Sequence, residues 1–347
     1  MKKILLATVV AVVCSTSAVL AADMKVKAPA APPPPPSPWD IAFGGGVYSD
    51  YVFRGISQSN HRPSVNAYFE PRYNLNENLQ LYAGVGGWSI AFANRTSGEI
   101  DIYGGIRPTF GKLAFDFGVW YYYYPGGQCF NGNVDFFGNS FGADCLVNGS
   151  LPVSGNVIKR DLSFIEYFGR ASWTPTDTFG IGASVYYDPD WLQFGTDGLY
   201  AVGAVKLTAP GSWMPTGTGV YLSAEIGRYW FGTADSFYCT VGATPQCGSP
   251  TAQFPNGTLY PFGIPLPDYT TWNVGIGLTW SVFTVDVRYY DTDLTEGECN
   301  ALTSDFTATF NPANISAINP GGFGSKWCGQ TYVISLKADL TWGSNIK

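Results

Sequence analysis

The sequence predicts an all-β fold, a closed antiparallel transmembrane β-barrel of about twelve strands. Three observations support this prediction. Segments of about ten residues alternate apolar and polar side chains with a period of two, which is typical of strands whose two faces meet different surroundings. Aromatic residues make up 16% of the 347-residue chain and charged residues only 13%, about half of the charged share of a soluble domain. The predicted connections also alternate in length along the chain.

Residues 1–22 are predicted to be a signal peptide. Two lysines, an apolar run too short to span a bilayer and small residues near Ala22 form the pattern of a secretory signal with a cleavage site. Residues 23–38 contain an unbroken proline run, Pro32 to Pro36, which favours an extended polyproline conformation. We expect a periplasmic spacer there; the alternative is a docking strip for a periplasmic partner or the cell wall.

The barrel domain is predicted to span residues 39–347. In its first strand the alternation places Ile41, Phe43, Val47, Tyr51 and Phe53 on one face, and Asp40, Tyr48, Asp50 and Arg54 on the other. The same rule predicts strands near residues 39–54, 63–74, 79–93, 98–109, 113–124, 161–174, 178–188, 197–208, 218–231, 270–281, 283–294 and 330–342.

The lengths of the connections predict the topology. Short turns alternate with four longer excursions, at 55–62, 125–160, 232–269 and 295–329. Outer-membrane barrels have short periplasmic turns and longer outside loops, so with a periplasmic N-terminus every long connection falls on the outer side. Aromatic residues crowd the predicted strand ends and suit girdles at the two membrane interfaces, among them Tyr121 to Tyr124, Trp173, Tyr186, Tyr187, Tyr229, Trp230, Phe231, Trp280 and Trp342. The alternative for these aromatics is the core of a soluble sandwich.

Six cysteines lie in the three longest loops, two in each. Their confinement to separate loops predicts three disulfides, which the oxidising periplasm would form before insertion. The predicted pairs are Cys129–Cys145, Cys239–Cys247 and Cys299–Cys328. A metal site is the competing interpretation, but the sequence has no CxxC pair and its single histidine lies in another loop. We therefore predict no metal and no cofactor.

Charged side chains are predicted to face the lumen, because a charge on the lipid face is costly. The residues expected to shape selectivity are Asp50, Arg54, Glu99, Asp101, Arg107, Asp116, Glu166, Arg170, Asp286 and Arg288. Inward tyrosines are also expected, at Tyr103, Tyr122, Tyr186, Tyr200 and Tyr221. Acids are in mild excess, so the pattern fits either a narrow, weakly cation-preferring channel or a plugged structural barrel. The net charge of −7 gives no basic surface for nucleic acid.

An outer-membrane lipid hydrolase is a third class to consider. The only histidine, His61, lies beside Ser59 and Asn60 in the first loop. A lone loop histidine is usually a solvated turn residue, and one loop does not establish the serine–histidine geometry that a nucleophile needs. We predict that the protein is not an enzyme. A surface adhesin or receptor stays open as an alternative, because the long loops offer aromatic surface.

The segment Tyr48-Ser49-Asp50-Tyr51-Val52-Phe53-Arg54-Gly55-Ile56-Ser57-Gln58-Ser59, followed by Pro63, resembles the opening signature of the TorF family of putative porins. The resemblance implies an outer-membrane barrel with porin-like activity. The proline-rich spacer and the cysteine-bearing loops depart from a short member of that family. Asp50 and Arg54 are expected on one face of the first strand, either as a salt bridge that closes the first hairpin or as contacts for a solute.

The expected function is passive diffusion of small hydrophilic solutes or ions through an outer-membrane channel. The alternative is a structural, adhesin or receptor barrel with a plugged lumen. The partners expected for either are outer-membrane lipid and lipopolysaccharide and the barrel-assembly machinery, and the sequence is compatible with an oligomer.

Overall fold

The computed structural model describes residues 37–128, 130–131, 157–158, 161–234, 265–316, 318–319 and 321–346. The predicted signal peptide and nearly all of the spacer lie outside the described residues, as do four predicted disulfide cysteines, Cys129, Cys145, Cys239 and Cys247. No helix in the described ranges is long and apolar enough to cross a membrane.

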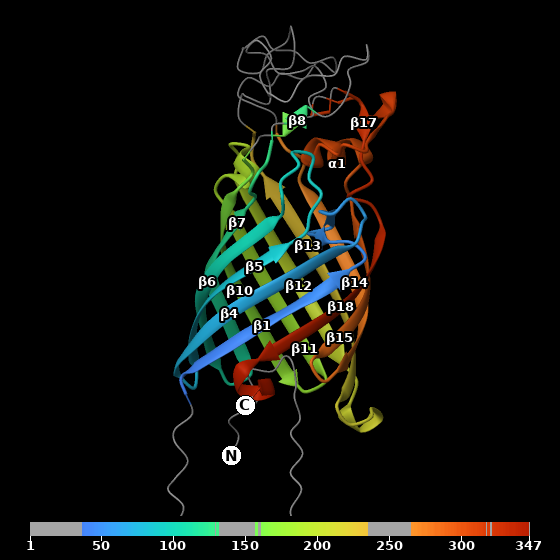
Figure 1. Ribbon diagram of the computed structural model, residues 1–347. Helices are drawn as coiled ribbons and strands as arrows, with labels where there is room; N and C mark the ends of the chain where they lie inside the picture. Colours follow the sequence, from blue (N-terminus) through green and yellow to red (C-terminus); the bar gives the residue numbers. More distant parts are fainter. Residues whose placement is uncertain are drawn as a thin grey trace, which may run out of the picture.

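Twelve antiparallel strands form one closed barrel (Figure 1). Each strand pairs with its neighbours around the ring, and the first pairs with the last in the register Gly46↔Lys337. The strands are β1 (Trp39–Tyr48), β4 (Ser64–Asn76), β5 (Leu79–Trp88), β6 (Glu99–Phe110), β7 (Leu113–Tyr123), β10 (Phe164–Thr176), β11 (Phe179–Asp188), β12 (Gly198–Thr208), β13 (Thr218–Phe231), β14 (Tyr269–Trp280), β15 (Phe283–Thr292) and β18 (Thr331–Thr341). Closure leaves no strand edge unpaired, as lipid requires. The predicted fold class is confirmed.

The two ends of the barrel differ. One end, which we call the loop end, carries α1 and β17, and the other, the turn end, carries tight turns and the C-terminal turn (Figure 1). The smaller elements are β2 (Val52–Phe53), β3 (Ile56–Ser57), β8 (Phe130–Asn131), β9 (Val157–Ile158), β16 (Thr309–Phe310), β17 (Phe323–Gly324), α1 (Glu296–Thr303), the 3₁₀ turns η1 (Trp191–Gln193), η2 (Gly211–Trp213) and η4 (Pro312–Asn314), and the π-helical turn η5 (Trp342–Ile346).

Large apolar side chains cover the outside of the barrel. Val47 is 53% exposed, Ile102 is 51% and Ile226 is 62%. The acidic side chains that point into the barrel, such as Glu70 and Asp286, are buried. A wall that is apolar outside and polar inside is the reverse of a soluble protein and matches a barrel solvated by lipid.

Glycines in the wall make room for rings that lie flat inside the lumen. A Cβ at Gly84 would stand 2.3 Å from the ring of Tyr103, and a Cβ at Gly227 would stand 2.3 Å from the hydroxyl of Tyr200. Such contacts are far below van der Waals distance, so only glycine fits at these two positions. The many glycines of the sequence thus allow a lumen lined with tyrosine.

Two predicted strands are too long. The third, expected over 79–93, ends at Trp88, and the first, expected over 39–54, ends at Tyr48; the remaining strand ends lie within three residues of their predicted positions. After Tyr48 the chain leaves the wall and forms the β2–β3 hairpin, in which Arg54 (φ +48°) and Gly55 (φ +82°) make the turn. The polar–apolar alternation simply continues past the point where the strand stops.

Tyr51 shows the consequence of that early turn. It was predicted on the lipid face, but it is 7% exposed. Its ring stacks on Trp88 at 4.0 Å and its hydroxyl donates to Glu99 Oε1 at 2.7 Å. The prediction for Tyr51 was wrong because a local pattern does not reveal where a chain folds into its own barrel.

Candidate functional site

The β2–β3 hairpin carries a buried charge, Arg54, into the barrel. Its side chain is 6% exposed. The guanidinium carbon lies 4.6 Å from the ring centroid of Phe53, 4.8 Å from Tyr186, 4.5 Å from Tyr200 and 4.9 Å from Tyr229. All four distances are within the range of cation–π attraction, which is strongest where water is excluded. We call the three tyrosines of the wall, Tyr186, Tyr200 and Tyr229, the ring cage.

Two buried carboxylates border the ring cage. Glu166 is completely buried and its Oε1 lies 2.6 Å from Arg54 Nη2. Asp188 is also completely buried and accepts a hydrogen bond from the Tyr229 hydroxyl at 2.7 Å. The antiparallel register Tyr167↔Tyr187 places Glu166 of β10 opposite Asp188 of β11. Like charges at such positions repel each other, and Arg54 is the cation that offsets them.

The rest of the first loop is held by Asp50, which is 3% exposed. Asp50 Oδ1 accepts from the hydroxyls of Ser57 and Ser59, each at 2.7 Å. Asp50 Oδ2 lies 2.8 Å from His61 Nδ1. The predicted salt bridge between Asp50 and Arg54 is therefore wrong: Asp50 fixes the loop that presents Arg54, while Arg54 pairs across the lumen.

His61 connects the first loop to the last one. Its Nε2 lies 3.0 Å from the carbonyl oxygen of Lys326. A carbonyl and a carboxylate both accept hydrogen bonds, so the imidazole satisfies both contacts when it is protonated at both nitrogens. The hydrogen bond to Asp50 raises the pKa of His61, although burial opposes this. Further links are Trp327 Nε1 to Asn60 Oδ1 at 2.9 Å and Ser57 N to Trp327 O at 2.8 Å.

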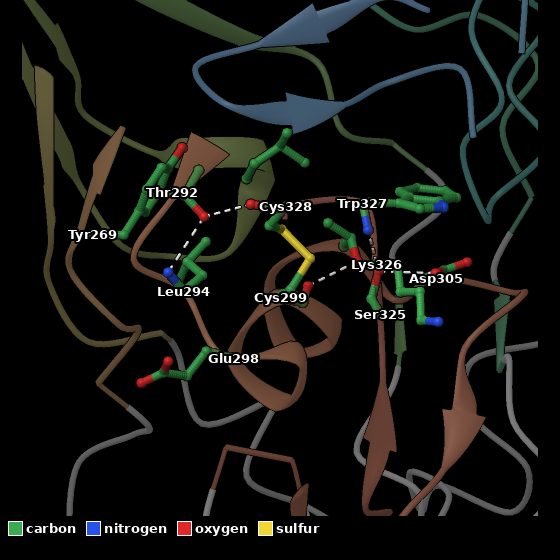
Figure 2. Close-up of a disulfide and its surroundings, with 12 residues drawn as sticks. Tyr269, Thr292, Leu294, Glu298, Cys299, Asp305, Ser325, Lys326, Trp327 and Cys328 are labelled. Carbon is green, nitrogen blue, oxygen red and sulfur yellow. Dashed lines mark hydrogen bonds between the residues drawn. A yellow bond between two sulfur atoms is a disulfide. The ribbon is translucent and has the colours of Figure 1, made fainter. Parts of the chain in front are cut away.

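The last loop is itself anchored by a disulfide between Cys299 and Cys328 (Figure 2). Cys299 belongs to α1, which begins with a capping box between Thr295 and Glu298. The carbonyl of Cys328 accepts from the Thr292 hydroxyl at 2.5 Å, so the bridge is tied to the end of β15. This confirms one of the three predicted disulfides; the other two fall outside the described residues.

The two loops pack together as a small apolar core across the loop end. Between them lies a cavity of about 60 Å³, whose lining includes Phe53, Ile56, Tyr124, Phe164, Trp191, Tyr269, Leu302 and Trp327. Apart from Phe53, which packs against it, these lining residues belong to one cluster of buried side chains, which also includes Tyr122, Phe194, Tyr200, Cys299 and Cys328. The hairpin is therefore docked as a packed plug.

Charges continue along the wall towards the turn end. Glu70 pairs with Arg72 at 2.6 Å and with Arg107 at 2.7 Å. Asp116 lies 3.4 Å from Arg107 and 3.7 Å from Arg170. The side chain of Arg107 is 28% exposed and that of Arg170 is 33% exposed. Water therefore reaches this part of the lumen, in contrast to the level of Arg54.

A second charged cluster lies on β13, β14 and β15. Arg288 Nη2 lies 3.1 Å from Asp286 Oδ2, and its Nη1 donates to Asn273 Oδ1 at 2.6 Å. Asn273 in turn donates to Glu225 at 2.9 Å, and the Tyr221 hydroxyl donates to Asp286 at 2.7 Å. Both signs of charge are thus interlinked on this side of the lumen too.

The predicted site residues fall into groups rather than a single ring. Asp50, Arg54 and Glu166 belong to the plug; Glu99 accepts from Tyr51 and Tyr124, and Asp101 is two residues further along β6. Arg107, Asp116 and Arg170 form one wall cluster, and Asp286 and Arg288 the other. Their role in selectivity stays a prediction.

Two features of the site differ from the sequence-based expectation. Tyr229, predicted to lie in an interface girdle, is 1% exposed and belongs to the ring cage, while its neighbour Trp230 is 39% exposed. His61, expected to be a solvated turn residue, joins two loops. His61 contacts Asp50, and the Ser59 hydroxyl lies 2.7 Å from both Asp50 Oδ1 and the Arg62 carbonyl oxygen. These contacts do not form a serine–histidine pair.

One family model matches the N-terminal part of the chain. A family model described as a bacterial protein of unknown function (Gcw_chp) matches residues 33–188, which is less than half of the chain. The resemblance to the TorF family is not confirmed by this match. No curated protein matches the chain. The chain forms an outer-membrane-type β-barrel.

Solved structures of similar shape are distant in sequence. The NanC porin is 8% identical, with 86% of this chain and 100% of that one covered and a TM-score of 0.37. LpxR from Salmonella typhimurium is 9% identical, with coverages of 86% and 99% and a TM-score of 0.37. OmpT, an outer membrane protein of Vibrio cholerae in trimer form, is 11% identical, with coverages of 88% and 98% and a TM-score of 0.31. These similarities say nothing of activity.

Proposed function

We propose that the protein is an outer-membrane channel for small hydrophilic solutes or ions, whose loop end is closed by the docked β2–β3 hairpin. One contrast carries the proposal. Arg170, four residues from Glu166 on the same strand, has a side chain that is 33% exposed, whereas the side chains of Glu166 and Arg54 are 0% and 6% exposed. A water-accessible, charged lumen thus leads up to a plug that one short hairpin makes.

The charges inside the barrel support a weak preference for cations. Six of the ten predicted selectivity residues are acids and four are arginines, and Asp188, which borders the ring cage, is a further acid. Acid-lined pores favour cations, and the preference weakens as salt screens the field. In this proposal the loop end faces outside, the apolar wall contacts outer-membrane lipid and lipopolysaccharide, and the barrel-assembly machinery inserts the chain.

Single-channel recording in planar bilayers tests the proposal. The refolded protein is compared with a variant in which Val52–Ile56 of the hairpin is replaced by a glycine–serine linker. We expect rare or small current steps for the natural chain and frequent, larger steps for the variant. Silence of both proteins, with refolding verified by circular dichroism, would contradict the channel proposal.

A plugged structural or adhesive barrel is the second candidate. The dense apolar packing around the hairpin favours it, because Leu162, Tyr229 and Trp327 are as buried as the core of a soluble protein. This candidate expects no current from either protein. It also expects that the hairpin variant loses thermal stability, since the plug would then contribute to the fold and to nothing else.

A further inference from the structure

The three tyrosines of the ring cage belong to strands of the barrel wall, whereas Arg54 belongs to the β2–β3 hairpin. Tyr186, Tyr200 and Tyr229 stand on three successive strands, β11, β12 and β13. Their rings support each other, with centroids 6.1 Å apart for Tyr186 and Tyr200 and 5.5 Å apart for Tyr200 and Tyr229. Withdrawal of the hairpin would remove Arg54 and Phe53 and leave the rest of the site in place.

The charge at this level of the wall exceeds what Arg54 neutralises. Glu166 and Asp188 are both completely buried, and Arg54 pairs with Glu166. Arg170, whose guanidinium carbon lies 5.4 Å from the Tyr186 ring centroid, pairs with Asp116 instead. Within the described residues, Asp188 Oδ1 and Arg54 Nη1 make no hydrogen bond. Buried polar atoms are nearly always hydrogen-bonded in native proteins. The unpaired carboxylate oxygen of Asp188 therefore marks a place where a hydrogen-bond donor is missing.

Arg54 also occupies the cage at a conformational cost. Its φ of +48° lies in the left-handed region, which L-residues other than glycine, asparagine and aspartate rarely adopt. The two-residue turn of the hairpin favours a positive φ at both Arg54 and Gly55, and arginine is an unusual residue for the first of these positions. The contacts of the guanidinium with the rings and with Glu166 offset the cost of an arginine at this position.

From these observations we infer that the ring cage with Glu166 and Asp188 is a binding site for small organic cations that carry a guanidinium group, and that Arg54 is its tethered internal ligand. The inference rests on the proposed channel function, for which it names a solute class. A planar guanidinium stacks on aromatic faces and pairs with a carboxylate through two parallel hydrogen bonds. Inorganic cations would require a cluster of oxygen ligands instead of rings.

The tether explains why a free cation does not enter the closed state. A group linked to the protein by a few residues competes at an effective concentration in the millimolar range or above. A free guanidinium compound therefore binds only when the hairpin is undocked, and binding holds the hairpin away. In this mechanism the hairpin undocks when the ring cage binds a solute that carries a guanidinium group.

Isothermal titration calorimetry with methylguanidinium chloride tests the inference on the refolded full chain in detergent micelles. We expect saturable binding by Arg54→Ala that is at least about tenfold tighter than any binding by the natural chain. Arg54→Gly, which suits the positive φ, provides the same test with less backbone strain. Arg72→Ala is the matched control, because it also removes a lumen arginine from an ion pair but is not at the ring cage.

Two further measurements identify the site. Adding Glu166→Gln to Arg54→Ala should abolish the gained binding, and methylurea, a neutral compound of the same shape, should not bind to any variant. Equal binding by Arg54→Gly and Arg72→Ala, or binding that survives the Glu166 change, overturns the inference. Calorimetry needs no current, so a variant that conducts without binding refutes the cage alone, and one that binds without conducting refutes the channel alone.

Discussion

Replacement of Arg54 by alanine should release the β2–β3 hairpin from the barrel. Arg54→Ala removes four ring contacts at 4.5–4.9 Å and the 2.6 Å pair with Glu166. It leaves Glu166 and Asp188 buried without a cation. Removing one partner of a buried ion pair costs about 3–5 kcal/mol, which lowers the ratio of docked to undocked hairpin about 10²- to 10³-fold or more.

Amide hydrogen exchange measures this ratio directly. Two amides report on docking, Ala91 N, bonded to the Gln58 carbonyl, and Ser57 N, bonded to the Trp327 carbonyl. Both should exchange at least about 100-fold faster in Arg54→Ala, while amides of the wall keep their protection. Arg72→Ala, whose side chain is 20% exposed, should leave both amides unchanged. Unchanged exchange at both amides in Arg54→Ala would show that Arg54 does not hold the hairpin.

Three other predictions concern His61, the acids of the lumen and the Cys299–Cys328 disulfide. The pKa of His61 is raised by Asp50. Protonated His61 therefore stabilises the closed loop fully below the ordinary pKa of about 6.5, and this stabilisation is lost as pH rises through the raised pKa. The current should increase with pH, and a His61→Gln protein should show no such increase. Neutralising Asp101 and Asp116 together should move the reversal potential towards anions under a salt gradient, and an unchanged potential in a conducting variant would mean that these acids do not line the path. Mass mapping of a non-reduced digest should recover a Cys299–Cys328 peptide pair, and reduction should speed proteolysis between these residues; free thiols in exported protein would argue against the bridge.

Most of the wall could be predicted from the sequence because each strand meets the same two environments along its whole length. Lipid on one side and lumen on the other impose the alternation residue by residue, so the pattern is local information. Glu99, Glu166 and Asp286 were placed inwards for this reason. The strand-end aromatics were less predictable, since Tyr229 and Trp230 are adjacent in the chain and point to opposite sides.

The plug could not be predicted because its contacts join segments distant in sequence. Arg54 meets Glu166 and Tyr229 only when the barrel has closed, and His61 meets Lys326 across the loop end. The alternation that runs from Trp39 to Arg54 gives no sign that the chain leaves the wall after Tyr48. The contacts that hold the hairpin inside the barrel, those of Arg54 with Glu166 and Tyr229, are tertiary and are not encoded in the local strand pattern.

The charge balance of the loop end connects the pH response to the cation response. Asp50, Glu166 and Asp188 are buried there, and the closed state places Arg54 against Glu166 and His61, whose pKa is raised, against Asp50. A ligand or proton shifts a conformational equilibrium only by its different affinity for the two states. Protons bind more tightly to His61 in the closed loop, while a free guanidinium compound binds only the cage that an undocked hairpin leaves. Acid and organic cations should therefore act in opposite directions on one hairpin, so the cation concentration that opens the barrel should rise as pH falls.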